Sequence, residues 1–142
     1  MLYVKPINEI TYDDIKNFIQ KKIKENTFLD YKADFPRRLE RTIAAMANTH
    51  GGVIIIGVKE DDGKPISNSE GIEYKRGLEE RITQIILDKI YPPVFPEIQV
   101  CPPKNNKTFV IIRIAESDST PHWINDKTDI YVRTGNLNRP EK

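Results

Sequence analysis

The feature that most constrains this sequence is the apolar run at residues 52–58, Gly-Val-Ile-Ile-Ile-Gly-Val. Its four central residues are all β-branched, and a glycine stands on each side of them. A short, continuous apolar run of this kind is typical of a strand that is covered on both faces. We therefore expect residues 52–58 to form a buried strand inside the domain.

Periodicity places the other elements around this strand. Helices are predicted over residues 10–24, 34–50 and 78–90, and further strands over residues 27–32, 98–101, 108–115 and 129–133. Thr11 can cap the first helix, since Asp14 follows at the capping-box position, while Asp34 and Pro36 mark the start of the second. Residues 61–64 form a turn. Because the strands cluster late in the chain, the predicted fold is α+β, with a mixed β-sheet and about three helices.

Length and composition indicate one cytoplasmic domain. The 142 residues fit a single domain with a helical lead-in at residues 1–24 and a polar tail at residues 136–142, of the kind that leads into a further domain. The single cysteine, Cys101, cannot form an intramolecular disulfide, which suits a reducing compartment. The longest apolar run, residues 53–56, is too short to span a bilayer, so no membrane association is expected.

A first group of candidate functional residues lies between residues 25 and 32. If the chain is extended from Thr27 onwards, Asp30 and Lys32 share one face of a strand, with Glu25 just before it. A carboxylate and an ammonium group placed together can serve a phosphate or a metal site. Solvated charges on an exposed strand edge would show the same spacing, so both interpretations stay open.

A second group follows the predicted second helix. Gly51 and Gly52 stand between this helix and the buried strand, where they permit a tight turn and a close approach of the backbone. A simple helix stop would also explain them. Asn48, just before these glycines, is a candidate polar contact for a ligand at this turn.

With a net charge of +1, nucleic-acid binding would depend on where the basic residues gather. At about 100° per residue, Arg37, Arg38 and Arg41 fall on the helix face opposite the apolar stripe. Residues 131–140 follow with two arginines, two asparagines and a glycine, a composition that can hydrogen-bond phosphates. A solvated helix face and a polar tail are the alternatives. The predicted nucleic-acid contacts are Lys32, Arg37, Arg38, Arg41, Asn48, Arg133, Asn136 and Arg139.

Four motifs, taken in order, resemble the Schlafen AlbA-like domain family. That family typically reads Glu-x-x-x-x-Glu-Phe-Lys, then Ala-x-Ala-Asn-Thr-x-Gly-Gly, then a strand ending in Gly-Val with acidic residues after it, and finally Tyr-x-Arg-x-Gly. The matching segments here are residues 25–32, 45–52, 56–60 and 131–135. Asp30 and Tyr31 replace the family's glutamate and phenylalanine. The resemblance runs from about residue 25 to residue 140 and implies a Schlafen AlbA-like core.

The resemblance implies two classes of function. Bacterial and archaeal members are commonly described as DNA-binding or transcription-regulator domains. Some animal members are metal-dependent endoribonucleases that act on transfer and ribosomal RNA. Carried over to this chain, their catalytic and metal-binding carboxylates would be Glu25, Asp30 and Glu60, with Mg²⁺ or Mn²⁺ as the cofactor. The animal nucleases enclose RNA with two lobes, so a single lobe would need a homodimer to build a comparable groove.

We rank a nucleic-acid-binding domain of a transcriptional or other regulatory protein first, and this function needs no cofactor. A metal-dependent endoribonuclease acting on structured RNA such as transfer RNA is second. An interaction or oligomerisation module is third, since it suits the near-neutral charge. The expected partner of the first two is DNA or RNA.

Overall fold

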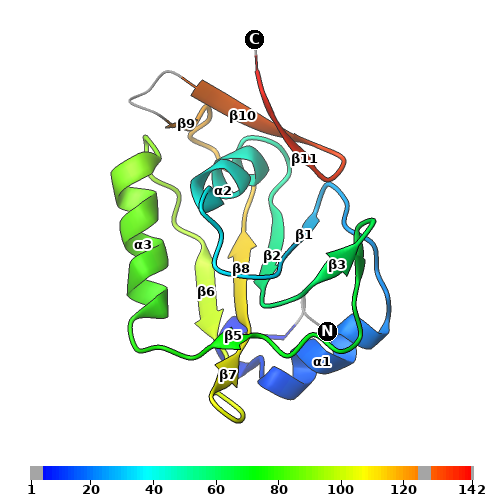
Figure 1. Ribbon diagram of the computed structural model, residues 1–142. Coiled ribbons are helices and arrows are strands. Elements are labelled where there is room, and N and C mark those ends of the chain that lie inside the picture. Colours follow the sequence, from blue (N-terminus) through cyan, green and yellow to red (C-terminus); the bar gives the residue numbers. More distant parts are fainter. Residues whose placement is uncertain (1–4, 125–128, 142) are drawn as a thin grey trace.

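The computed structural model describes residues 5–124 and 129–141. Its centre is a four-stranded sheet in the order β1-β2-β8-β6 (Figure 1). The strands are β1 (Leu29–Lys32), β2 (Gly52–Ile56), β6 (Glu97–Val100) and β8 (Val110–Ile114). β1 pairs with β2 in parallel, whereas β8 pairs antiparallel with both β2 and β6. The sheet is therefore mixed, and the predicted pairing of the segments around residues 98–101 and 108–115 is confirmed.

The β-branched run predicted to be a buried strand forms β2 and is covered on both faces. Ile54 and Ile56 point into one apolar cluster, and Val53 and Ile55 point into another on the opposite face. All four side chains are at most 2% exposed. This alternation divides the domain into two layers of core, one on each side of the sheet.

Helices cover the two faces unequally. The described residues form three α-helices, α1 (Tyr12–Gln20), α2 (Leu39–Ala47) and α3 (Leu78–Lys89), together with a short 3₁₀ helix, η1 (Ile7–Glu9). The helices α2 and α3 contribute to the cluster that contains Ile54, and α1 to the cluster that contains Val53. Thr11 and Asp14 form the predicted capping box at the start of α1. The α+β prediction is confirmed.

A C-terminal hairpin lies over α2 (Figure 1). It consists of β10 (Asp129–Thr134) and β11 (Leu137–Pro140), and β9 (Trp123–Ile124) pairs with the other edge of β10. The segment predicted as a polar tail, residues 136–142, thus contains a strand over most of the part that the structure describes. Most of its residues can be polar because this strand is largely exposed at the edge of a small sheet.

Two short strand pairs complete the described chain. β3 (Glu60–Asp61) pairs with β4 (Lys64–Pro65) around the predicted turn, in which Asp62 and Gly63 have φ values of 52° and 82°. β5 (Ile72–Glu73) pairs with β7 (Lys107–Thr108). Within the described ranges, no helix is both long enough and apolar enough to cross a membrane.

Several predicted boundaries were wrong, and three of them have a clear local cause. The first helix ends at Gln20 rather than at residues 22–24, because Lys22 adopts a left-handed conformation with φ of 58°. The second helix begins at Leu39, not near Asp34, because Arg38 has the non-helical angles φ −123° and ψ 42°. The strand predicted over residues 27–32 begins only at Leu29, after a tight turn closed by backbone hydrogen bonds between Asn26 and Leu29.

Candidate nucleic-acid interface

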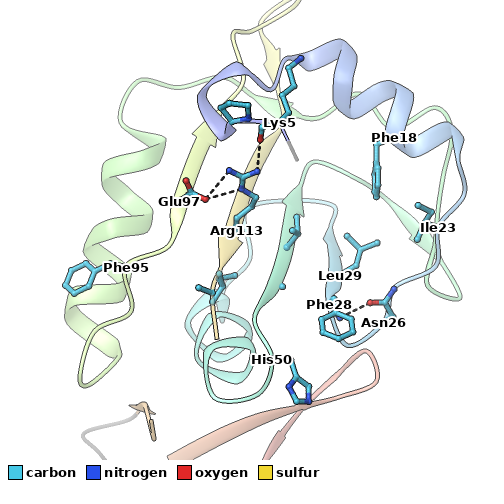
Figure 2. A pocket seen from close by; sticks show the side chains of 15 residues that line it. Lys5, Phe18, Ile23, Asn26, Phe28, Leu29, His50, Phe95, Glu97 and Arg113 are labelled. Atoms are coloured by element: carbon cyan, nitrogen blue, oxygen red, sulfur yellow. Dashed lines mark hydrogen bonds and ion pairs between the residues drawn. The ribbon is translucent and has the colours of Figure 1, made fainter. Parts of the chain in front are cut away.

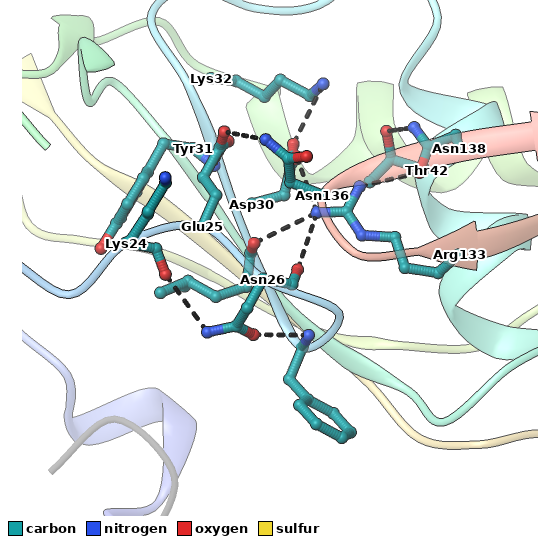
Figure 3. A network of polar contacts seen from close by, with 12 residues as sticks. Lys24, Glu25, Asn26, Asp30, Tyr31, Lys32, Thr42, Arg133, Asn136 and Asn138 are labelled. Carbon is teal, nitrogen blue, oxygen red and sulfur yellow. Dashed lines mark hydrogen bonds and ion pairs between the residues drawn. The ribbon is translucent and has the colours of Figure 1, made fainter. Parts of the chain in front are cut away.

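Asp30 is the centre of a polar network between β1 and the C-terminal hairpin (Figure 3). The residue is only 4% exposed. Its Oδ1 accepts a hydrogen bond from Arg133 Nη2 at 3.0 Å, and its Oδ2 lies 3.0 Å from Lys32 Nζ. The prediction that Asp30 and Lys32 share one face of the strand is therefore confirmed. The carboxylate lies between two cations. Their attraction offsets the free-energy cost of removing the buried charge from water.

Arg133 connects the hairpin to β1. Its side chain is 0% exposed, and its Nη2 also donates to the backbone oxygens of Asn26 and Leu29, each at 3.1 Å. Its Nη1 donates to Asn138 Oδ1 at 2.8 Å. The buried Nε has no hydrogen-bond partner among the described residues. Arg133 was predicted to contact nucleic acid, but the structure directs its guanidinium into the domain.

Glu25 lies along the exposed edge of β1 and bonds to its backbone. Its Oε2 accepts a hydrogen bond from the backbone N of Tyr31 at 2.8 Å, and its Oε1 lies 3.5 Å from Asn136 Nδ2. Burial raises the pKa of Glu25 above its usual 4.5, and the negative charges of Asp30 and Glu60 raise this pKa further. Asp30 and Glu60, the other two carboxylates of the predicted triad, thus lie near enough to Glu25 to affect its pKa.

The triad as placed does not fit a divalent metal ion. Within the part of the chain that the structure describes, no group of three or more His, Cys, Asp or Glu side chains is placed to hold one. Asp30 faces Lys32 and Arg133, whereas a hard cation needs free carboxylate oxygens. Glu60 is exposed, and its Oε2 accepts a hydrogen bond from the backbone N of Gly63 at 2.6 Å.

Replacing Glu25 with glutamine should change how stability depends on pH. Because folding raises the pKa of Glu25, its favourable contribution is complete below about pH 4.5 and is lost as the pH rises through the raised pKa. Glu25→Gln, which mimics the protonated carboxyl, should therefore gain stability relative to the wild type between acidic and neutral pH. Urea unfolding of both proteins across this range measures the difference, and a constant difference would contradict the assignment.

The exposed basic residues gather where α2 begins. Arg37 and Arg38 are exposed, and neither side chain makes an ion pair or hydrogen bond within the described residues. The guanidinium carbon of Arg41 lies 5.0 Å from the centre of the Tyr131 ring in β10. Glu40, the acid among these arginines, is only 7% exposed. Because α2 begins at Leu39, the arginines do not form the predicted helical stripe but occupy a loop and the first turn.

Arg139, the remaining arginine predicted to contact nucleic acid, lies on the outer face of the hairpin. In β11 it pairs with Val132 and is exposed, whereas the neighbouring Asn138 donates to Thr42 Oγ1 of α2 at 2.7 Å. Because side chains alternate along a strand, Arg139 is directed away from α2. We call Arg37, Arg38 and Arg41 the arginine surface. Lys32 and Asn136 lie nearer to the Asp30 network, where each contacts a carboxylate.

Asn48 is used inside the protein. Its Nδ2 donates to the backbone oxygens of His122 and Tyr131, at 3.1 and 2.9 Å, and its Oδ1 accepts from the backbone N of His122 at 2.8 Å. The amide therefore joins the end of α2 to the hairpin rather than facing a ligand. Thr49, which sequence reasoning passed over, has the same role, since its Oγ1 accepts from Arg133 N at 2.9 Å.

The chain belongs to the Schlafen AlbA_2 family, because that family model matches residues 11–142. A search of curated proteins found no match. One similar solved structure is the N-terminal domain of a protein from Nitrosomonas europaea that is described as related to the ATP-dependent DNA helicase RecG. It is 17% identical with a TM-score of 0.57, over 77% of this chain and 75% of that one. Another is the DIP2311 protein of Corynebacterium diphtheriae, 18% identical with a TM-score of 0.58, over 91% of this chain but only 26% of the other.

Proposed function

We propose that this domain binds nucleic acid and that the arginine surface contacts the phosphates. The observation that supports this most directly is the exposure of Arg37 and Arg38, whose guanidinium groups have no partner within the described residues. Arginine presents paired N–H donors that match phosphate oxygens, and phosphate contacts supply most of the affinity of many nucleic-acid complexes.

The position of the arginines supports the same function. Arg41 is held against the ring of Tyr131, so less side-chain freedom is lost when it meets a ligand. The near-neutral net charge is compatible with binding because the acids of the neighbouring network, Glu25 and Asp30, are directed into hydrogen bonds within the domain. The name of the similar N. europaea protein, which refers to a DNA helicase, agrees with a nucleic-acid function.

Removing two of these charges should weaken binding. Each charge-assisted hydrogen bond to a phosphate is worth about 1.5–3 kcal/mol, so Arg37→Gln combined with Arg38→Gln should lower the affinity at least about tenfold. The slope of log affinity against log salt should fall by about one unit for each arginine. Filter binding of labelled duplex DNA and of transfer RNA, at several salt concentrations, measures both quantities.

The control variant removes the same charge from another part of the surface. Lys104 and Lys107 are exposed around the turn before β8, and Lys104→Gln with Lys107→Gln should leave the affinity and the salt slope nearly unchanged. If the two double variants lose affinity equally, the effect comes from net charge alone and not from the position of the arginines. Binding that is indifferent to salt would contradict the proposal.

A metal-dependent endoribonuclease is the second candidate, and the effect of the charges of Asp30 and Glu60 on the pKa of Glu25 favours it, because it requires the other two carboxylates to lie near Glu25. The same transfer RNA samples, incubated with Mn²⁺ or with EDTA and separated on a denaturing gel, distinguish the two. Fragments that require the metal and disappear in Glu60→Gln would favour the nuclease. Glu60 is the suitable position because it is exposed and takes no part in the ion pairs of Asp30.

A further inference from the structure

Arg81, on α3, lies over the ring of Phe35 in the loop that leads to α2. Its guanidinium carbon is 3.9 Å from the centre of the ring, well within the range of a cation–π contact. Phe35 is partly buried and packs against the core cluster to which α2 and α3 contribute. The core therefore fixes the ring, and the ring holds the guanidinium above it.

This contact joins α3 to the arginine surface. Phe35 stands two residues before Arg37, and α2 and α3 contact each other on the same side of the sheet (Figure 1). Arg41, in the first turn of α2, lies on the ring of Tyr131 in a similar way, 5.0 Å from its centre. Two arginines in this region are thus held on aromatic rings, and the two exposed arginines of the loop stand between those contacts in the sequence.

The charge of Arg81 is not neutralised within the described part of the chain. Its side chain is exposed and makes no ion pair or hydrogen bond there. Residues three and four positions apart are neighbours on the surface of a helix. For Arg81 these residues are Gly77, Leu78, Gln84 and Ile85, none of which is acidic. The N–H groups at the edge of the stacked guanidinium therefore remain available to an anionic ligand.

The two rings that hold these arginines are not open to the bases of a ligand. Tyr131 is only 8% exposed, Phe35 is partly buried, and a guanidinium lies over each ring. Proteins that bind single strands without sequence preference use open aromatic rings, on which successive bases stack. Here the rings hold cations instead, and cations suit the phosphates along the outside of a duplex.

The more exposed aromatic rings of the described chain lie elsewhere. Phe95 and Phe28, which are 80% and 49% exposed, stand at opposite ends of a groove on the sheet face opposite α2 and α3 (Figure 2). Tyr91 follows the far end of α3, about 15 Å along the helix axis from Arg81. Tyr74 precedes α3, where its backbone N donates to the backbone oxygen of Asn106. The arginines and the open rings thus occupy different parts of the surface.

We propose that Arg81 joins the arginine surface in binding the phosphates of double-stranded nucleic acid, and that Phe35 positions its guanidinium. This inference rests on the function proposed above and names the form of the ligand. A duplex carries about one negative charge per 1.7 Å of its axis, a higher density than that of a single strand. Phosphate contacts do not read the bases, so DNA and RNA duplexes share the chemistry that this surface recognises.

Fluorescence anisotropy tests the form of the ligand with a short DNA duplex, the RNA duplex of the same sequence, and one strand of each. The protein should bind a duplex at least about fivefold more tightly than its separate strand, with a steeper dependence on salt. The tighter of the two duplexes identifies the ligand as DNA or RNA. Equal or tighter binding of the single strands overturns the inference but leaves nucleic-acid binding in place. If neither duplexes nor strands bind, the proposed function is overturned as well.

Replacing Arg81 tests its part in the contact. Arg81→Gln should lower the affinity for the duplex roughly fivefold and reduce the salt slope by about one unit. Lys89→Gln is the matched control, because Lys89 is exposed on the same helix and lies about two turns further along it. This control should leave both quantities nearly unchanged. If the double variant of Arg37 and Arg38 loses affinity and Arg81→Gln behaves like the control, the proposed function stands and this inference is overturned.

Two further variants test whether the ring positions the guanidinium. Phe35→Leu keeps every charge and an apolar side chain against the core, and circular dichroism shows whether it folds as the wild type does. Arg81→Lys keeps the charge without any change to the core, but an ammonium group cannot lie flat on the ring. Each should lower the affinity roughly threefold with the salt slope unchanged, because more side-chain freedom is lost on binding. Unchanged affinity in both variants would contradict the role of Phe35.

Discussion

Replacing Arg133 with methionine should lower the free energy of unfolding by about 3–5 kcal/mol, the usual cost of removing one partner of a buried ion pair. The side chains of Arg133 and Asp30 are 0% and 5% exposed, so Asp30 would be left in a poorly solvated site with only Lys32 opposite it. The backbone oxygens of Asn26 and Leu29 would lose a donor as well.

Urea denaturation of the variant measures this loss of stability. Two further variants serve as comparisons. Lys104→Met breaks an ion pair of 2.9 Å whose side chains are 58% and 68% exposed, and it should cost less than about 1 kcal/mol. Asp30→Leu combined with Arg133→Met removes both buried charges and should recover part of the lost stability. If Arg133→Met costs no more than Lys104→Met, the ion pair does not hold the hairpin in place.

Hydrogen exchange should show where the destabilisation acts. Arg133 and Asn48 both join the C-terminal hairpin to the rest of the domain, by contacts with β1 and with the end of α2. Without the guanidinium, amides of β10 and β11 should exchange faster than those of β2 and β8. This pattern would identify the hairpin as a separate unit of local stability.

Local patterns predicted most of the secondary structure. The β-branched run at residues 52–58 could be recognised as a buried strand because its burial on both faces leaves no alternation of polar residues. The start of α2 could not be found, because Asp34 and Pro36 are ordinary helix-start signals and tertiary packing decides that Phe35 instead contacts the core. The strand β11 was missed because an exposed edge strand needs no alternation of apolar and polar residues.

The candidate site was predicted in part. Strand alternation placed Asp30 and Lys32 on one face, and their ion pair follows from it. The partner that decides the role of Asp30 is Arg133, which is 103 residues away in sequence and is brought near only by the fold. An arginine in a polar segment suggests a phosphate contact, and no local pattern shows that its side chain is completely buried. Nor does any local pattern show that the Asn48 amide bonds to the hairpin.

A substitution in the turn between α2 and β2 should give the second large loss of stability. Gly51 has φ of 75°, and a Cβ atom placed on it would lie 2.8 Å from the backbone N of Glu116 and nearer still to the backbone oxygen of Ile114. The close backbone approach predicted from Gly51 and Gly52 is therefore confirmed, although what approaches is the end of β8 rather than a ligand. Backbone atoms cannot move aside as a flexible side chain can, so a substitution here must displace β8 or the turn.

Gly51→Ala should destabilise the domain by considerably more than Gly135→Ala. Gly135 also has a positive φ, of 57°, but a Cβ atom on it would meet nothing within 4 Å. Both variants pay about 1–2 kcal/mol for the left-handed backbone, and the clash at Gly51 should add about 1–3 kcal/mol. Thermal unfolding followed by circular dichroism compares them directly. Equal losses would show that backbone conformation alone, and not the contact with β8, requires glycine at this turn.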